Sequence, residues 1–249
     1  MSTSSQIIKN VFSNWAYYFL QIVTSFFLMP FLVHSMGDAI YGIWTLILST
    51  AGYMGLVNFE IRSAVIKYIS EFRAKKEQEK INEITSTGFY SYTILGGIVL
   101  AITLIVANYF DRIFQIESAY AGETKIAFIF IGLNLAINLP FAAFGGLIWG
   151  YQKYDFNSGV EIGMLIARTA LIVIFVKMGY GLVALSIITI IINIMGQIAR
   201  VFYAYKLNPE LVISYKLFKK ETWKLISNYS LFAFLITIAA QLIYNTDNV

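Results

Sequence analysis

The residue with the clearest potential for chemistry is Arg168, which lies in the middle of an apolar run at residues 159–177. An arginine at the centre of a membrane-spanning helix costs about 2.5–3.5 kcal/mol on insertion scales. Glu161 lies seven residues earlier, about 10 Å along a helix, which is too far for direct pairing. Two interpretations stay open: Arg168 binds an anion in a central cavity, or neighbouring carbonyl and amide groups satisfy it.

Polar side chains recur at helical spacing in three other apolar runs. Spacings of three and four residues place each set on one helix face. The sets are Asn14, Tyr17, Gln21 and Thr24; Asn134 and Asn138; and Ser186, Thr189, Asn193, Gln197 and Arg200. Such a face lines a wet cavity or bonds to neighbouring helices, because hydrocarbon cannot satisfy it. Packing is the simpler explanation for any one amide, whereas three stripes together favour a cavity.

Other kinds of site are disfavoured by composition. The 249-residue chain has no Cys and one His, so it cannot build a thiolate zinc site, a multi-His metal site or a disulfide framework. Its four Asp are scattered, which leaves no D-x-D nucleotide-sugar motif and no paired carboxylates for acid–base work. We therefore expect no cofactor, no metal and no catalytic residue, and a protein that is not an enzyme.

The elements that position the polar residues are predicted to be membrane-spanning helices. The chain is 58% hydrophobic and 13% charged, whereas soluble proteins are nearer 45–50% and about 25%. Apolar runs occur at residues 12–33, 40–59, 87–108, 126–149, 159–177, 182–204 and 226–246. They predict an all-α, polytopic membrane protein with about seven transmembrane helices.

The basic residues predict the orientation of these helices. If the N-terminus is cytoplasmic, every Lys and Arg lies in an inside segment except Arg112, Lys125, Lys177 and the intramembrane Arg168. This distribution is a strong positive-inside bias. We therefore expect the N-terminus to lie in the cytoplasm.

Two inside segments are predicted to be amphipathic helices along the membrane. The first carries an apolar stripe of Ile61, Val65, Tyr68 and Phe72 opposite a basic face. The second begins at Asn208 as N-cap with Pro209 following, and its stripe is Leu211, Tyr215 and Phe218. The G-x-x-x-G spacings at Gly146 and Gly150, and at Gly159 and Gly163, predict close helix packing.

A faint internal repeat indicates the domain organisation. Ser13–Ala16 (SNWA) opens the first apolar run and Ser227–Ser230 (SNYS) opens the seventh. A parallel repeat of six spans is an established transporter plan. We expect a six-helix lobe at residues 1–205, a cytoplasmic amphipathic connector at 206–225, and the first helix of a second lobe at 226–249. A single helix opening a second repeat indicates a piece of a longer protein.

Several motifs together resemble a known family. They are LMPFLV at residues 28–33, MGDAIYGIW at 36–44, GYMGLVNF at 52–59 and the basic segment at 62–68. The set is similar to the opening of the polysaccharide-biosynthesis flippases, the O-antigen and lipid-linked oligosaccharide exporters of the multidrug/oligosaccharidyl-lipid/polysaccharide exporter superfamily. The ending NTDNV at 245–249 resembles the family's seventh-helix segment. Glu60 departs from the pattern, since relatives often have Gly there.

The resemblance implies a V-shaped, two-lobed, alternating-access flippase in the bacterial cytoplasmic membrane. Its substrate would be an undecaprenyl-pyrophosphate-linked oligosaccharide for surface polysaccharide synthesis. Membrane lipids and other polysaccharide assembly proteins are implied as partners, and nucleic acid is not. The candidate substrate-binding residues are Arg168, Asn14, Gln21, Asn138, Asn193 and Gln197, and the candidate cytoplasmic gate residues are Glu60, Arg62 and Lys67.

Three alternatives stay open. An ion-coupled multidrug exporter of the same superfamily would be expected to carry an acidic residue in mid-membrane, and none is evident. A membrane-embedded glycan polymerase or glycosyltransferase would need a large external loop or a carboxylate-bearing nucleotide-sugar site, and both are absent from the sequence. A non-transporting scaffold would keep its function when the cavity charges are neutralised.

Overall fold

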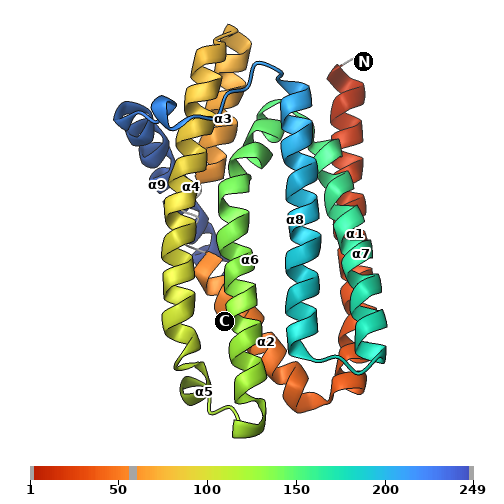
Figure 1. Ribbon diagram of the computed structural model, residues 1–249. Coiled ribbons are helices and arrows are strands. Elements are labelled where there is room, and N and C mark those ends of the chain that lie inside the picture. The colour runs from red at the N-terminus through yellow and green to blue at the C-terminus, as the bar shows by residue number, and fades with distance from the viewer. Residues whose placement is uncertain (1–2, 56–60, 247–249) are drawn as a thin grey trace.

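The computed structural model describes residues 3–55 and 61–246, and these ranges are almost entirely helical (Figure 1). The all-α class predicted from the apolar runs is therefore confirmed. The elements are α1 (Thr3–Met36), α2 (Asp38–Gly55), α3 (Ile61–Lys75), α4 (Gln78–Ala107), α5 (Phe110–Ile113), α6 (Ser118–Gly150), α7 (Tyr154–Lys177), α8 (Leu182–Leu207), the 3-10 turn η2 (Tyr215–Leu217) and α9 (Lys220–Thr246).

Each predicted apolar run corresponds to one of these helices. Five helical segments are long and apolar enough to cross a bilayer: Lys9–Met36, Gln78–Ala107, Ser118–Gly150, Tyr154–Lys177 and Leu182–Leu207. The other two runs fall on α2 and α9. The chain is thus a multi-pass membrane protein by the length and composition of its helices.

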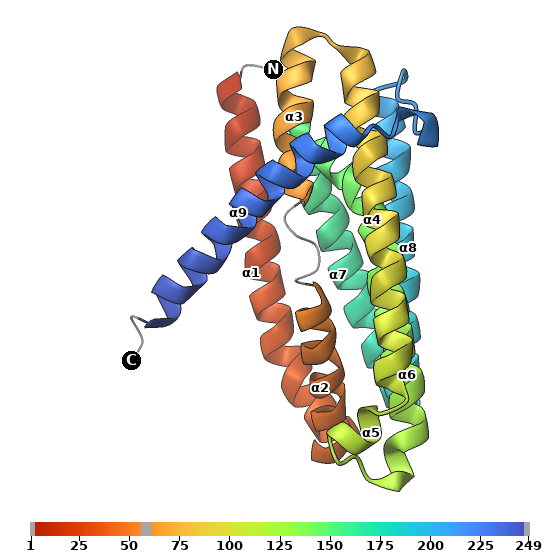
Figure 2. The same cartoon turned by 90° about the vertical axis from the view of Figure 1, so that its left-hand side faces the viewer.

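Apart from α2 and α3, which both run toward the end where α1 begins, successive long helices run in opposite directions, so most connections gather at two ends of the bundle (Figures 1 and 2). The α3–α4 and α6–α7 turns and the end of α8 lie at the end where α1 begins. The α1–α2 turn, α5 and the α7–α8 turn lie at the other end. We call the first the basic end, because the segments predicted to face the cytoplasm meet there. The sidedness of the bundle in the membrane stays a prediction.

Helix α6 is the central element and packs against α4, α8, α3 and α2. Pro140 lies inside α6 and has no backbone N–H, so the carbonyl of Ala136 loses its usual helical donor. That carbonyl faces α4 at Gly96, where an added Cβ would lie 2.6 Å from the Ala136 oxygen. Glycine at position 96 therefore permits the close approach of α4 and α6.

Helix α3 differs from the prediction of a helix lying along the membrane. Its apolar stripe is buried against other helices, and Val65 and Ile69 are fully buried. They pack on α6 at Gly146 and Gly150, where an added Cβ would lie 2.8 Å from Val65 and 2.6 Å from Ile69. The glycine surface of α6 thus makes α3 part of the bundle core. The first G-x-x-x-G prediction is confirmed, whereas Gly159 and Gly163 have no close neighbour.

The connector at residues 208–219 also corrects the sequence prediction. Asn208 is the C-cap of α8 instead of the start of a helix, and only the short turn η2 follows before α9. The backbone of the connector bonds to α4 instead: Ser86 Oγ donates to the Val212 carbonyl at 3.2 Å, and the Asn82 side chain bonds both Glu210 and Val212. These contacts with α4 replace the hydrogen bonds that a local helix would supply.

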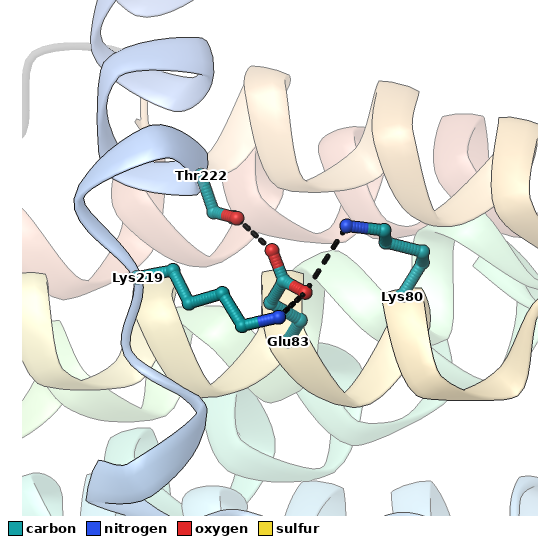
Figure 3. A network of polar contacts seen from close by, with 4 residues as sticks. All are labelled: Lys80, Glu83, Lys219 and Thr222. Atoms are coloured by element: carbon teal, nitrogen blue, oxygen red, sulfur yellow. Dashed lines mark hydrogen bonds and ion pairs between the residues drawn. The ribbon is translucent and has the colours of Figure 1, made fainter.

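Glu83 joins the connector and α9 to α4 at one buried point (Figure 3). Its carboxylate accepts hydrogen bonds from Lys80 at 3.2 Å, from Lys219 at 2.9 Å and from the Thr222 hydroxyl. The hydrogen bond and the charge of Glu83 raise the pKa of Lys219 above its ordinary value. Lys219 therefore stays protonated at neutral pH, and its charge offsets the cost of burying Glu83.

Helix α9 runs obliquely to the other helices (Figure 2). Its first half packs against α3 and α4, and its described side chains beyond that point include the exposed Leu235 and Ile236. Whether α9 belongs to a second lobe stays a prediction.

Candidate functional site

A polar cavity of about 220 Å³ lies inside the bundle, in the half nearer the basic end. Its lining comes from α3, α6, α7 and α8, so it forms only when four helices pack together. The lining residues are Arg62, Leu135, Asn138, Leu139, Phe141, Ala142, Gly145, Glu161, Gln197 and Arg200. Among the described residues, two arginines and one glutamate give this lining a formal positive charge.

Arg200 is the most deeply buried cation of the cavity, with 6% of its surface exposed. Its Nε donates to Asn157 Oδ1 at 3.0 Å, and its Nη2 forms an ion pair with Glu161. Asn157 and Glu161 are four residues apart on α7, so one helix face supplies both partners. Two partners fix the guanidinium plane and leave further donors available to a bound group.

Arg62 enters the same cavity from the first turn of α3. Its guanidinium carbon lies 4.1 Å from the centre of the Trp149 ring, a cation–π contact. Gly145 on α6 lies against it, and a Cβ at that position would be in ordinary contact with Arg62, 3.4 Å from Nη2. Arg62 was predicted as a gate residue, and the structure places it in the cavity beside Glu161 and Arg200.

The amide stripes of α6 and α8 form a ladder between the two helices. Asn193 Nδ2 donates to Asn134 Oδ1 at 2.9 Å, and Gln197 Nε2 donates to Asn138 Oδ1 at 2.6 Å. Gln197 Oε1 is a buried acceptor with no hydrogen-bond donor among the described residues. The Asn134–Asn193 pair thus joins the two helices, whereas the Asn138–Gln197 pair also lines the cavity.

The other candidate residues lie away from the cavity lining. Asn14 and Gln21 are exposed on α1, which packs chiefly on α7. Lys67 is exposed on α3, and its Nζ lies over the rings of Tyr68 and Tyr229. Glu60 lies outside the described residues. The structure therefore brings together the stripes of α6 and α8 and leaves the α1 stripe apart.

Arg168 is half-buried on α7 and does not line the cavity. Within the described ranges it forms no hydrogen bond or ion pair, in keeping with the absence of a partner on its own helix. It lies within electrostatic reach of Tyr17 on α1, as do Glu161 and Arg200. Arg168 therefore continues the charged face of α7 from Glu161 toward the middle of the bundle.

In the sequence, Arg200 is only the last member of a polar stripe and one of the inside positive charges. The signal that could have singled it out is the pair Asn157 and Glu161, spaced to hold one partner from a neighbouring helix. The described residues contain no group of three or more His, Cys, Asp or Glu side chains that could hold a metal.

Comparison with known proteins identifies the fold. The chain is 18% identical over 237 residues to the uncharacterized membrane protein EpsK of Bacillus subtilis (strain 168), covering 91% of this chain and 47% of EpsK. It also superimposes on a solved multidrug resistance MATE family transporter of the MOP superfamily in an outward-facing conformation. That match has a TM-score of 0.77 and 14% identity, and it covers 97% of this chain and 55% of the transporter.

No protein-family model matches the sequence. At these identities the likeness to the solved transporter is one of fold. The chain has the helical architecture of part of that solved transporter, and it spans about half the length of both proteins.

Proposed function

We propose that this chain forms one lobe of an exporter that moves an undecaprenyl-pyrophosphate-linked oligosaccharide across the bacterial cytoplasmic membrane for surface polysaccharide synthesis. The observation that carries the proposal is the cavity shared by Arg62 and Arg200. Guanidinium groups bind phosphate oxygens through paired hydrogen bonds, and a low-dielectric site strengthens that interaction. The transporter fold supports export as the use of such a site.

The size of the cavity limits what it holds. At about 220 Å³ it is smaller than most pockets for whole ligands, which measure about 300–1,000 Å³. It suits the pyrophosphate head, with the amides of Asn138 and Gln197 available to the first sugar. Arg168, deeper on α7, is proposed as the next cation that the head meets during transport.

Export of cationic drugs is the nearest alternative, since the similar solved structure is a multidrug resistance transporter. The cavity favours an anion instead. Glu161, the one acidic residue among the described residues that line it, is already paired with Arg200, and Arg62 is a second cation in this lining. A cation entering this cavity would therefore be repelled.

The test is glycan export in a bacterial strain that lacks its flippase, complemented with the natural gene that contains this chain. Arg62→Gln and Arg200→Gln are each expected to lower surface glycan at least about tenfold, because each removes a charged hydrogen bond to phosphate. Arg168→Ala is expected to remove export while membrane insertion stays intact, since deleting the charge relieves an insertion cost. The matched control is Lys206→Gln, an exposed cation on α8, and it should export normally.

Normal export by well-expressed Arg62→Gln and Arg200→Gln would contradict the proposal. Normal export by Arg168→Ala alone would remove only this residue from the substrate path.

A further inference from the structure

A second cavity, of about 350 Å³, lies between α3, α4 and the first half of α9. Its walls include Ile61, Leu95, Trp223, Ser227, Ser230 and Leu231. None of these residues lines the arginine cavity. A mostly apolar pocket of this volume with a few polar groups has the character of a ligand site.

The Ser230 hydroxyl in this cavity has no hydrogen-bond partner among the residues that the structure describes. Ser230 is 2% exposed, and its hydroxyl oxygen has no hydrogen bond to any described residue. A serine inside a helix usually bonds the carbonyl four residues earlier, so an unbonded and buried hydroxyl is uncommon. It indicates a ligand that carries a hydrogen-bonding atom next to an apolar portion.

Exposed apolar side chains lie in and beside the lining of this cavity. Leu231 is 57% exposed, and Ile94, beside Leu95 on α4, is 61% exposed. In a membrane these side chains meet hydrocarbon, so an acyl chain reaches the cavity directly from the bilayer. Trp223 lies seven residues before Ser230 on α9, about two helical turns nearer the basic end.

A cation, Lys67, lies where α3 packs against α9, two of the helices that border this cavity. Lys67 Nζ is 4.4 Å from the centre of the Tyr68 ring and 4.5 Å from that of Tyr229, the residue before Ser230. No ion pair between described residues includes Lys67, and the residue is exposed. Lysines at the membrane surface attract anionic lipid headgroups.

We propose that this cavity binds an anionic membrane phospholipid. One acyl chain fills the space between α4 and α9, an ester oxygen accepts the Ser230 hydroxyl, and the phosphate lies at Lys67. This assignment does not depend on the proposed export function, because it uses none of the residues of the arginine cavity. It gives the α3–α4–α9 junction a lipid ligand and explains why the Ser230 hydroxyl has no hydrogen bond to any described residue.

The test is quenching of Trp223 fluorescence by lipids with dibrominated acyl chains. The full chain is reconstituted in vesicles of phosphatidylcholine that contain brominated phosphatidylglycerol or brominated phosphatidylcholine. Subtracting the fluorescence of the Trp223→Phe variant from that of the unmodified chain gives the contribution of Trp223. We expect phosphatidylglycerol to quench at about fivefold lower mole fraction, the effect of one lysine at the surface. Lys67→Gln should abolish this preference, whereas Lys206→Gln should retain it.

Filling the cavity provides the second arm. Leu95→Phe is expected to weaken quenching by both lipids, and Ser227→Leu serves the same purpose should Leu95→Phe fail to fold. Equal quenching by the two lipids in the unmodified chain would overturn the proposal, because it would indicate only the general lipid annulus. A preference that survives Lys67→Gln, or quenching that neither cavity-filling variant weakens, would overturn it as well.

Discussion

The two halves of the bundle bury different kinds of side chain. The half nearer the basic end packs α3 against α4 and α6, and it contains Glu83 and Arg200, the two buried charged residues among those described. The opposite half buries an apolar cluster in which the rings of Phe110 and Phe128 lie 4.5 Å apart. Three of its buried hydroxyls, on Thr103, Ser186 and Thr189, bond to carbonyls of their own helices, as Thr103 does to the Val99 carbonyl at 2.8 Å.

The two halves therefore have different roles, one in packing and the other in holding charged groups. A hydroxyl that bonds to its own helix adds little cost, whereas a buried charge is costly unless it is paired and hydrogen-bonded. The opposite half therefore holds the helices together by packing. The half nearer the basic end retains costly groups, and these line the cavity or join α9 to α4.

The largest effect is expected from truncation in the apolar half. Phe128→Ala should lower the free energy of unfolding by about 3–5 kcal/mol, because it leaves a cavity beside Phe110. The measurement is unfolding by a denaturing detergent, followed by circular dichroism. Phe26→Ala, whose side chain is 73% exposed on α1, is the control and should change stability by less than about 1 kcal/mol. Equal losses of stability in the two variants would contradict the packing role assigned to the apolar half.

A smaller loss is expected when the buried ion pair is broken. Glu161→Leu leaves Arg200 buried with one partner and should cost about 3 kcal/mol in the same unfolding measurement. The double variant Glu161→Leu with Arg200→Met should recover most of that loss, since it leaves no unpaired charge. Glu71→Gln breaks the exposed pair with Lys75 at 2.6 Å and should change stability by under about 0.5 kcal/mol. A double variant as unstable as the single one would show that the pair itself stabilises the fold.

The smallest effect concerns the Glu83 contacts. Glu83→Gln weakens the hydrogen bonds from Lys80 and Lys219. Because both lysine side chains are about half exposed, only about 1 kcal/mol of local stability should be lost. Limited trypsin cleavage at Lys216 should then be about fivefold faster. Glu79→Gln, an exposed change on the same helix, is the control.

The contribution of Lys219 to these contacts also has a pH dependence. Its pKa is raised in the folded chain, so the stabilisation is complete below the ordinary lysine pKa and is lost as the pH rises through the raised value. The trypsin cleavage rate of the unmodified chain should therefore be constant across neutral pH.

In the Glu83→Gln experiment, a cleavage rate equal to that of the unmodified chain would contradict the prediction. It would show that the connector is held by its backbone contacts alone.

The helices themselves were predictable because each apolar run is long enough to be distinguished from a strand by length. The apolar stripe of α3 was also predicted correctly. The surface on which this stripe packs was not predictable, because a stripe buried against other helices and a stripe facing the membrane have the same periodicity. The choice was decided by Gly146 and Gly150 on a helix some eighty residues away. Similarly, the helix signal at Asn208 is local, whereas the bonds from Asn82 and Ser86 that oppose it are not.

A polar cavity with a cation was predictable from the sequence, whereas several of the residues that line it were not. Arg168 stood out because its position in the sequence is central to an apolar run. Arg200 lies near the end of its run, where an arginine costs little. Its burial depends on how α7 and α8 pack, which places Asn157 and Glu161 opposite it. The amides Asn138 and Gln197 were found from spacing alone, because both follow the period of a helix.

The most direct test of the central claim is equilibrium binding of radiolabelled undecaprenyl pyrophosphate to the purified chain in nanodiscs. Arg62→Gln and Arg200→Gln are each expected to raise the Kd at least about tenfold, the effect of one lost hydrogen bond to a charged group. Lys206→Gln should leave the Kd within about twofold of its original value. An unchanged Kd in both cavity variants, with their folding intact, would contradict the assignment of this cavity as the anion site.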